Sequence, residues 1–169
     1  RILSFLAEYL DKDKFITTLL VVGKESDAVY AVQDTKVEFL NKTRVLNGIP
    51  SLIKFILKNK PDIVLSSIGH LNTVFGLLSP FFHYTKFVIR EASVVSIMSK
   101  YSNPNKFYGI LSRKAYKNID AVICQSHDMA NDFKNIYSVP NSRITVINNP
   151  ITELFPIKNK PTSNKVMKY

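Results

Sequence analysis

Short apolar runs alternate along the chain with longer stretches whose apolar residues recur at helical spacing. The short runs read as strands, and they lie at 15–22, 37–40, 63–66, 87–90, 121–124 and 144–147. The helical spacing predicts helices at 1–10, 50–59, 71–78, 105–118 and 126–136. Nearly continuous apolar strands that alternate with helices are typical of a parallel sheet covered on both faces. The pattern therefore predicts an α/β fold, a Rossmann-like doubly wound sheet with helices on both faces.

The length of 169 residues fits a single domain. We expect that domain to occupy 1–150, because the last strand candidate ends just before Asn148-Asn149-Pro150. Beyond this point the chain is polar and rich in Lys, Pro, Asn, Ser and Thr. Such composition indicates a linker at 151–169.

Composition adds a strong positive charge to this picture. The net charge of +10 implies attraction to an anionic membrane surface, a phosphate-bearing substrate or nucleic acid, with a generally basic surface as the alternative. The single cysteine, Cys124, excludes an internal disulfide and fits a reducing compartment. We find neither a secretory signal nor an apolar run long enough to span a membrane. A cytoplasmic protein is expected, with a peripheral position on the inner face of the cell membrane as a further expectation.

Several kinds of chemistry can be excluded from the motifs. The chain has neither the GxGxxG nor the GxxxxGK[ST] pattern that would hold a nucleotide phosphate, and no cofactor is expected. Its three histidines lack metal-ligand spacing, so no metal site is expected. Ser126, His127 and Asp128 are consecutive helix positions about 100° apart and cannot form a catalytic triad.

Polar residues directly after predicted strands are the candidates for ligand contact, because ligands of such sheets collect at the carboxyl ends of the strands. These candidates are His70, Arg90, Glu91, Gln125 and Ser126. Each has a structural alternative: a local hydrogen bond for His70, an internal salt bridge for Arg90 and Glu91, and helix capping for Ser126. The residue types alone do not assign a catalytic group.

The predicted helix at 105–118 has a basic side. It carries Lys106, Arg113, Lys114 and Lys117, with further positive charge nearby at Lys100. A basic amphipathic helix of this kind suits an anionic lipid surface. Nucleic acid is the less favoured partner. RNA recognition uses aromatic residues on an open sheet face, and a sheet covered by helices offers no such face.

Four stretches, in order along the chain, resemble the N-terminal domain of glycosyltransferase family 4. They are Lys60-Pro61-Asp62-Ile63-Val64, Ile89-Arg90-Glu91-Ala92, the run from Asn118 to Ser126 followed by Met129, and the segment from Val139-Pro140 through Ile144-Thr145-Val146-Ile147 to Asn149-Pro150-Ile151. The resemblance implies one half of a GT-B fold. It further implies a retaining enzyme that moves a sugar from a nucleotide-sugar donor to a saccharide or lipid-linked acceptor, with this half contacting the acceptor.

In that family the C-terminal domain binds the nucleotide and supplies a basic pair and a Glu-x7-Glu motif. We expect this domain and the family's first strand to be missing here, so that the fragment is inactive alone. With a sheet order of 3-2-1-4-5-6, we expect either a slot between 15–22 and 63–66 or a collapse of these strands into direct contact. In either case low stability or solubility is expected. The alternative function is a stand-alone basic module that binds an anionic membrane surface or nucleic acid.

Overall fold

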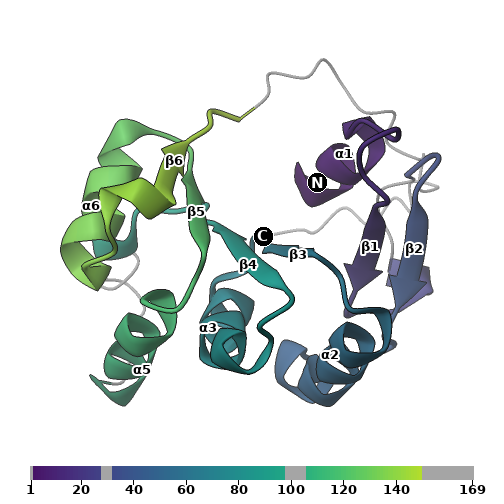
Figure 1. The fold of residues 1–169 in the computed structure, drawn as a ribbon. Coiled ribbons are helices and arrows are strands. Elements are labelled where there is room, and N and C mark those ends of the chain that lie inside the picture. Colours follow the sequence, from purple (N-terminus) through teal and green to yellow (C-terminus); the bar gives the residue numbers. More distant parts are fainter. Residues whose placement is uncertain (1, 28–31, 98–105, 150–169) are drawn as a thin grey trace, which may run out of the picture. The chain divides into compact units, whose positions relative to one another are not determined.

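The computed structural model describes residues 2–27, 32–97 and 106–149 of the chain. These residues divide into two compact units, one lying before Val45 and the other running from Val45 to Asn149 (Figure 1). Each unit is built on its own parallel sheet.

The first unit pairs two parallel strands beside one helix. Its elements are α1 (Ile2–Tyr9), β1 (Thr18–Val21), the 3-10 turn η1 (Glu25–Asp27) and β2 (Lys36–Phe39). The carbonyl of Ala7 in the last turn of α1 accepts hydrogen bonds from Lys12 Nζ (2.5 Å), Thr17 Oγ1 (3.1 Å) and Thr35 Oγ1 (2.7 Å). Helix ends leave carbonyls without intrahelical partners, so these side chains complete the C-terminus of α1 and tie it to both strands.

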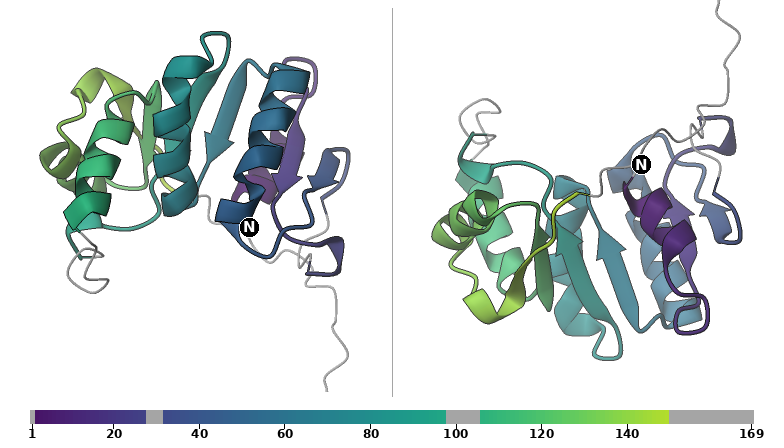
Figure 2. Two further views of the ribbon diagram at one scale, coloured as in Figure 1. Left: turned by 90° about the horizontal axis from the view of Figure 1, so that it is seen from below. Right: turned by 90° about the horizontal axis from the view of Figure 1, so that it is seen from above.

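The second unit holds a four-stranded parallel sheet in the order β3-β4-β5-β6. Its strands are β3 (Ile63–Ser66), β4 (Lys86–Arg90), β5 (Ala121–Cys124) and β6 (Ile144–Val146). Its helices are α2 (Val45–Asn59), α3 (Gly69–Leu78), α5 (Lys106–Tyr116) and α6 (His127–Tyr137), with 3-10 turns η2 (Ser79–Phe81) and η3 (Asn141–Arg143). Each strand joins the sheet beside the one before it, so right-handed crossovers place α3, α5 and α6 in a row on one face (Figure 2).

The core of this unit lies between the central strands and that row of helices. Phe87, Ile89, Val122 and Cys124 of β4 and β5 have no exposed surface. Phe75 of α3 packs on Phe87 with ring centroids 5.5 Å apart. Burial of these apolar side chains is the main favourable contribution to folding, at about 25 cal/mol per Å² removed from water.

Helices α3 and α5 approach each other closely at Gly76. A Cβ built on Gly76 would lie 2.6 Å from the carbonyl carbon and 2.9 Å from the Cβ of Ala115. Only glycine leaves room for the backbone of α5 at this point. Two hydrogen bonds extend the contact, from Ser79 Oγ to the carbonyl of Asn118 (2.9 Å) and from Asn118 Nδ2 to the carbonyl of Gly76 (3.2 Å).

These elements confirm the Rossmann-like α/β fold class, with parallel sheets flanked by helices. The pairing of β1 with β2, and of β3 with β4, agrees with the order expected around the family's first strand. The predicted slot between 15–22 and 63–66 stays a prediction. The predicted division into a domain at 1–150 and a linker also stays a prediction, and 151–169 lies outside the described residues.

Two helix starts differ from the sequence-based expectation. Helix α2 begins at Val45 rather than at Pro50, which lies inside the helix. Proline removes one bond to the carbonyl four residues earlier; here that residue is Leu46, which is two-thirds exposed, at 66%. Helix α3 begins at Gly69 rather than Leu71, so His70 belongs to its first turn and not to a loop.

Candidate functional site

The carboxyl ends of the four parallel strands bring polar residues together in the second unit. Ser67 follows β3, Arg90 ends β4, Gln125 follows β5, and Asn148 and Asn149 lie beyond β6. Parallel strands present their carboxyl ends at one edge, which is where ligands of such sheets bind. Side chains from all four strand ends are joined there by hydrogen bonds.

Arg90 is the charged centre of this cluster. Its side chain is 7% exposed, and Nη1 donates to Ser67 Oγ at 2.9 Å while Nη2 donates to Asn149 Oδ1 at 2.6 Å. Burial lowers the pKa of the guanidinium, but an arginine stays protonated in proteins. Within the described residues no carboxylate lies at ion-pair distance from it. The predicted Arg90–Glu91 salt bridge is therefore not formed, and neutral groups hold the cation.

Gln125 links the ends of β4 and β6. Its Oε1 accepts from Asn149 Nδ2 at 2.6 Å, and its Nε2 donates to the carbonyl of Glu91 at 3.3 Å. Asn148 Nδ2 donates to the carbonyl of Gln125 at 3.0 Å. The Asn149 side chain thus bridges Arg90 and Gln125, which fixes the orientation of both amides.

Glu91 follows Arg90 but makes different contacts. Its Oε1 accepts from the backbone N–H of Ala92 (3.1 Å) and Ser93 (3.4 Å) and from Ser93 Oγ (3.3 Å). Burial raises the pKa of the Glu91 carboxyl, while these bonds and the charge of Arg90 lower it less. Glu91 therefore shapes the loop after β4 and is harder to ionise than an exposed glutamate.

Two buried polar atoms near these strand ends have no hydrogen-bond partner. They are Ser66 Oγ at the end of β3 and Asn72 Oδ1 in α3, on residues that are 2% and 1% exposed. The Nδ2 of Asn72 reaches the carbonyl of Arg90 at 3.5 Å. Buried polar groups without a partner are uncommon in folded proteins, so this end of the sheet keeps hydrogen-bonding capacity that the described residues do not use.

The other predicted site residues have different surroundings. His70 is exposed in the first turn of α3, and its ring meets that of Tyr108 edge-on at 6.5 Å. Ser126 caps α6, since its Oγ accepts from the backbone N–H of Met129 at 3.2 Å. The structure brings Arg90 and Gln125 into one hydrogen-bonded cluster, which Glu91 joins through its carbonyl. It gives His70 and Ser126 separate local contacts. An acceptor-binding role for these five residues stays a prediction.

Beside this edge the surface is hollowed between α6 and β6. The hollow holds about 510 Å³, and its polar lining comes from His127 and Asn131 of α6, from Asn141, and from Thr145 and Asn148. Asn148 belongs to both the hollow and the cluster at the strand ends. Three of the polar lining residues are asparagines, and amides suit neutral polyhydroxylated ligands because they both donate and accept hydrogen bonds.

Sequence reasoning missed Ser67, Asn72, Asn148 and Asn149. Ser67 directly follows β3, and Asn148 and Asn149 lie two and three residues beyond β6. The positional rule that selected Arg90 and Gln125 therefore points to these three residues as well. Asn72 does not follow a strand, so the positional rule does not select it. Helical periodicity places it on a buried face, which gives no indication of a role in ligand contact. Cys124 is fully buried, and burial raises the pKa of its thiol to about 11, which keeps it protonated.

Metal-binding and membrane-spanning features were sought among the described residues. They contain no group of three or more His, Cys, Asp or Glu side chains that could hold a metal ion. None of the helices among them is long and apolar enough to cross a membrane. Of the predicted basic residues, Arg113 and Lys114 are exposed on α5 and Lys117 is exposed directly after it, whereas the side chain of Lys106 lies outside the described residues.

A parallel α/β fold with a polar cluster at its carboxyl edge is the arrangement of a ligand-binding domain of the doubly wound class. In a comparison with family models, residues 3–153 match the model described as Glycosyltransferase Family 4. The chain therefore belongs to glycosyltransferase family 4 and corresponds to the N-terminal domain of that family. A comparison with curated proteins found no match.

Proposed function

We propose that this domain binds the acceptor in a retaining glycosyltransferase, which transfers a sugar from a nucleotide-sugar donor to a saccharide or lipid-linked acceptor. The family supports glycosyl transfer in general. The retaining outcome, the donor and the acceptor class rest on the resemblance of the sequence. We further propose that the donor nucleotide is bound by a separate domain, because the chain has no glycine-rich phosphate loop.

The observation that carries this proposal is the hydrogen-bonded chain Ser67–Arg90–Asn149–Gln125. It presents hydroxyl, guanidinium and amide groups, and groups of these kinds bind sugar hydroxyls and phosphate oxygens. Arg90 supplies a positive charge, and no carboxylate of the described residues lies at ion-pair distance from it. An acceptor that carries a phosphate, as lipid-linked saccharides do, would place a negative charge beside the guanidinium of Arg90.

The decisive experiment separates acceptor binding from donor binding in an enzyme form that includes the donor-binding domain. Arg90→Gln removes the charge and the forked pair of donors. A hydrogen bond to a charged group contributes about 1.5–3 kcal/mol, so the acceptor KM should rise roughly 10- to 100-fold. The donor KM should stay unchanged, because the proposed donor site lies elsewhere.

Two further variants control this measurement. Lys134→Gln removes an exposed positive charge from α6 and should leave both KM values unchanged. Arg90→Lys keeps the charge without the planar fork, so its acceptor KM should lie between those of the wild type and Arg90→Gln. A rise in donor KM with an unchanged acceptor KM would show that the cluster serves the donor, and the proposal would be wrong.

A further inference from the structure

Helix α5 has one face that is fixed inside the second unit. Ser112, Ala115 and Tyr116 are almost fully buried, at 2%, 0% and 3% exposed. Thr73 of α3 lies 3.4 Å from Ser112 Oγ, and the Tyr116 ring packs on Phe133 of α6 at 5.2 Å. Contacts from α3 and α6 therefore determine which side of α5 faces inward, and so which side faces outward.

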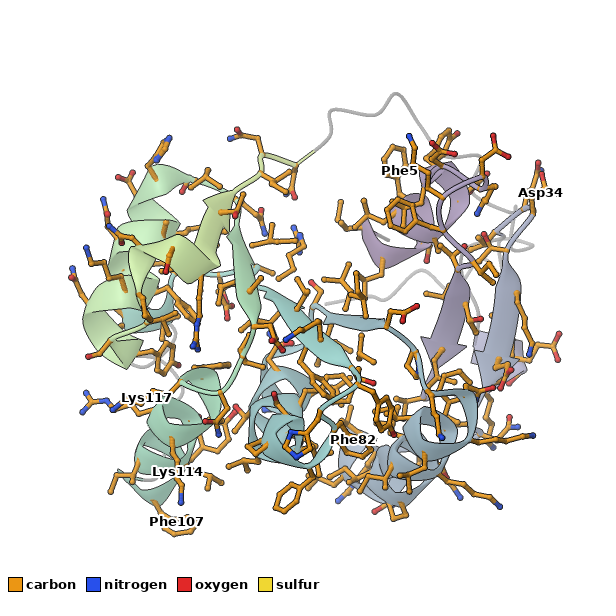
Figure 3. All side chains as sticks on the ribbon, viewed as in Figure 1. Phe5, Asp34, Phe82, Phe107, Lys114 and Lys117 are labelled. Atoms are coloured by element: carbon orange, nitrogen blue, oxygen red, sulfur yellow. The ribbon has the colours of Figure 1, made fainter. Side chains whose placement is uncertain are left out.

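The outward face of α5 combines large apolar side chains with positive charges. Phe107 and Ile110 are each 69% exposed, and Arg113, Lys114 and Lys117 are exposed as well. At 3.6 residues per turn the four positions within α5, Phe107, Ile110, Arg113 and Lys114, fall within roughly 120° of the helix circumference, opposite the buried side. Lys117 directly follows the end of the helix. Figure 3 shows Phe107, Lys114 and Lys117 directed away from α3 and the sheet. We call these five residues the α5 face.

Nothing on α5 offsets this positive charge. The helix contains no Asp or Glu. The ion pairs among the described residues are Lys14–Asp11, Lys36–Glu38 and Lys86–Asp120, and none of them includes a cation of the α5 face. The whole chain carries +10. The α5 face thus combines positive charges that form no ion pair among the described residues with two apolar side chains, Phe107 and Ile110.

We propose that the α5 face lies on an anionic lipid bilayer. Phe107 and Ile110 enter the boundary between headgroups and acyl chains, as the apolar residues of interfacial helices do. The cations remain at headgroup level, because long basic side chains keep their charged ends in the polar layer. The attraction of each basic residue to an anionic leaflet strengthens binding about fivefold.

Lipid is favoured over nucleic acid by the apolar part of the α5 face. Single-stranded nucleic acid is held by basic grooves with aromatic platforms for the bases. Ile110 offers no stacking surface, and it lies between the charges where a phosphate backbone would run. A bilayer accepts both kinds of side chain at once. The proposal concerns α5 alone and does not depend on the role of Arg90.

The first test is partitioning of the full chain onto vesicles that contain phosphatidylglycerol, at low salt. The triple variant Arg113→Gln, Lys114→Gln, Lys117→Gln should lower the partition coefficient roughly 100-fold, from about fivefold for each charge. The matched control is Lys54→Gln, Lys58→Gln, Lys60→Gln, which removes three exposed charges at α2. An equal loss in the control would show attraction by net charge alone and would overturn the proposal.

The second test exploits the absence of tryptophan from the chain. Ile110→Trp introduces a single fluorophore into the α5 face, and its emission should shift to the blue on anionic vesicles as the indole leaves water. Thr145→Trp, at an exposed position of β6, should show no shift on the same vesicles. Unchanged emission of Ile110→Trp on bound protein would contradict insertion.

A third measurement compares lipid with nucleic acid. Wild-type protein should bind the vesicles, and Phe107→Ser with Ile110→Ser should weaken that binding at any salt concentration. A single-stranded RNA of mixed sequence should compete poorly. If RNA displaced the vesicles, or if the double serine variant bound them as tightly as the wild type, the α5 face would not be a lipid-binding surface.

Discussion

At the residue scale, the end of β4 separates two charged side chains that are adjacent in sequence. Successive residues of an extended chain point to opposite sides. Arg90 accordingly bonds Ser67 and Asn149 among the strand ends, whereas Glu91 bonds the loop residue Ser93. Burial is the larger cause of the raised pKa of Cys124, and the negative charge of Glu91 is the smaller one. The charge of Glu91 therefore also acts on the buried thiol of β5.

The burial of Glu91 makes a prediction about stability and pH. Its pKa in the folded protein lies above the ordinary value of 4.5, so the unfolded chain ionises first as pH rises. The contribution of Glu91 to the free energy of unfolding should therefore fall as pH rises from about 4.5 towards the folded pKa, and then stay constant. Glu91→Gln has no carboxyl at this position and does not lose stability in this way. Its free energy of unfolding, relative to that of the wild type, should therefore increase over the same pH interval. Urea unfolding at several pH values measures the difference.

Asp62→Asn provides the control for this pH experiment, because it removes an exposed carboxylate from the same unit. The comparison is between the free energies of unfolding of each variant and the wild type, and the difference for Glu91→Gln should vary more with pH than the difference for Asp62→Asn. If the two variants showed the same pH dependence, burial of Glu91 would not be the cause.

The cluster around Arg90 was only partly predictable from sequence. Strand ends could be located, so Arg90 and Gln125 were identified from position alone. Their partners were not, because the Asn149 bridge depends on β6 lying next to β5 and on the path of the chain after Val146. The predicted helix at 71–78 leaves out His70, but α3 starts at Gly69, and the ring of His70 in its first turn meets that of Tyr108.

At the element scale, the contact between α3 and α5 determines the direction of the α5 face. The two helices touch through Gly76 and Ala115, and the hydroxyls of Tyr108 and Thr73 lie 3.1 Å apart one turn earlier. Because the interior is closely packed, a small increase in volume at such a contact cannot be absorbed without displacement.

Gly76→Ala should therefore destabilise the protein by about 1–3 kcal/mol, the usual cost of overpacking. The matched control is Gly109→Ala on α5, where an added Cβ meets nothing within 4 Å. Alanine is favoured over glycine within helices, so the control should be neutral or stabilising by up to about 1 kcal/mol. Chemical denaturation measures both variants, and a stabilising Gly76→Ala would show that the helices separate readily.

Most elements were predictable because their apolar patterns are distinct. The bounds of β3 and β5 agree with the sequence prediction, since each is a short, mainly apolar run that begins directly after an aspartate, Asp62 or Asp120. The start of α2 was wrong because Pro50 was taken as the first turn. Pro50 lies inside α2, and the carbonyl that loses its helical bond there belongs to Leu46, an exposed residue. Local rules do not reveal that exposure.

At the scale of the whole molecule, the two units differ in how deeply their strands are buried. Strands β1 and β2 form a two-stranded sheet in which no residue is fully buried. Strands β4 and β5 are central in their sheet and contain residues with no exposed surface. A two-stranded sheet has few partners to stabilise it.

Hydrogen exchange should therefore distinguish the two units. Backbone amides of β4 and β5 should be the most protected, because they open only in the largest unfolding events. Amides of β1 and β2 should exchange faster, through local opening that leaves the second unit intact. Mass spectrometry of exchanged peptides measures this, and equal protection of the two sheets would indicate a single cooperative unit.

The strand order β3-β4-β5-β6 also bears on how the chain folds during synthesis. Each strand after β3 pairs with the one made immediately before it. A nascent chain leaving the ribosome can thus extend its sheet one strand at a time, without waiting for a later segment to be inserted between two earlier strands. Domains are generally made and folded from the N-terminal side. The second unit can therefore grow in the direction of translation, with its newest strand always at the open edge.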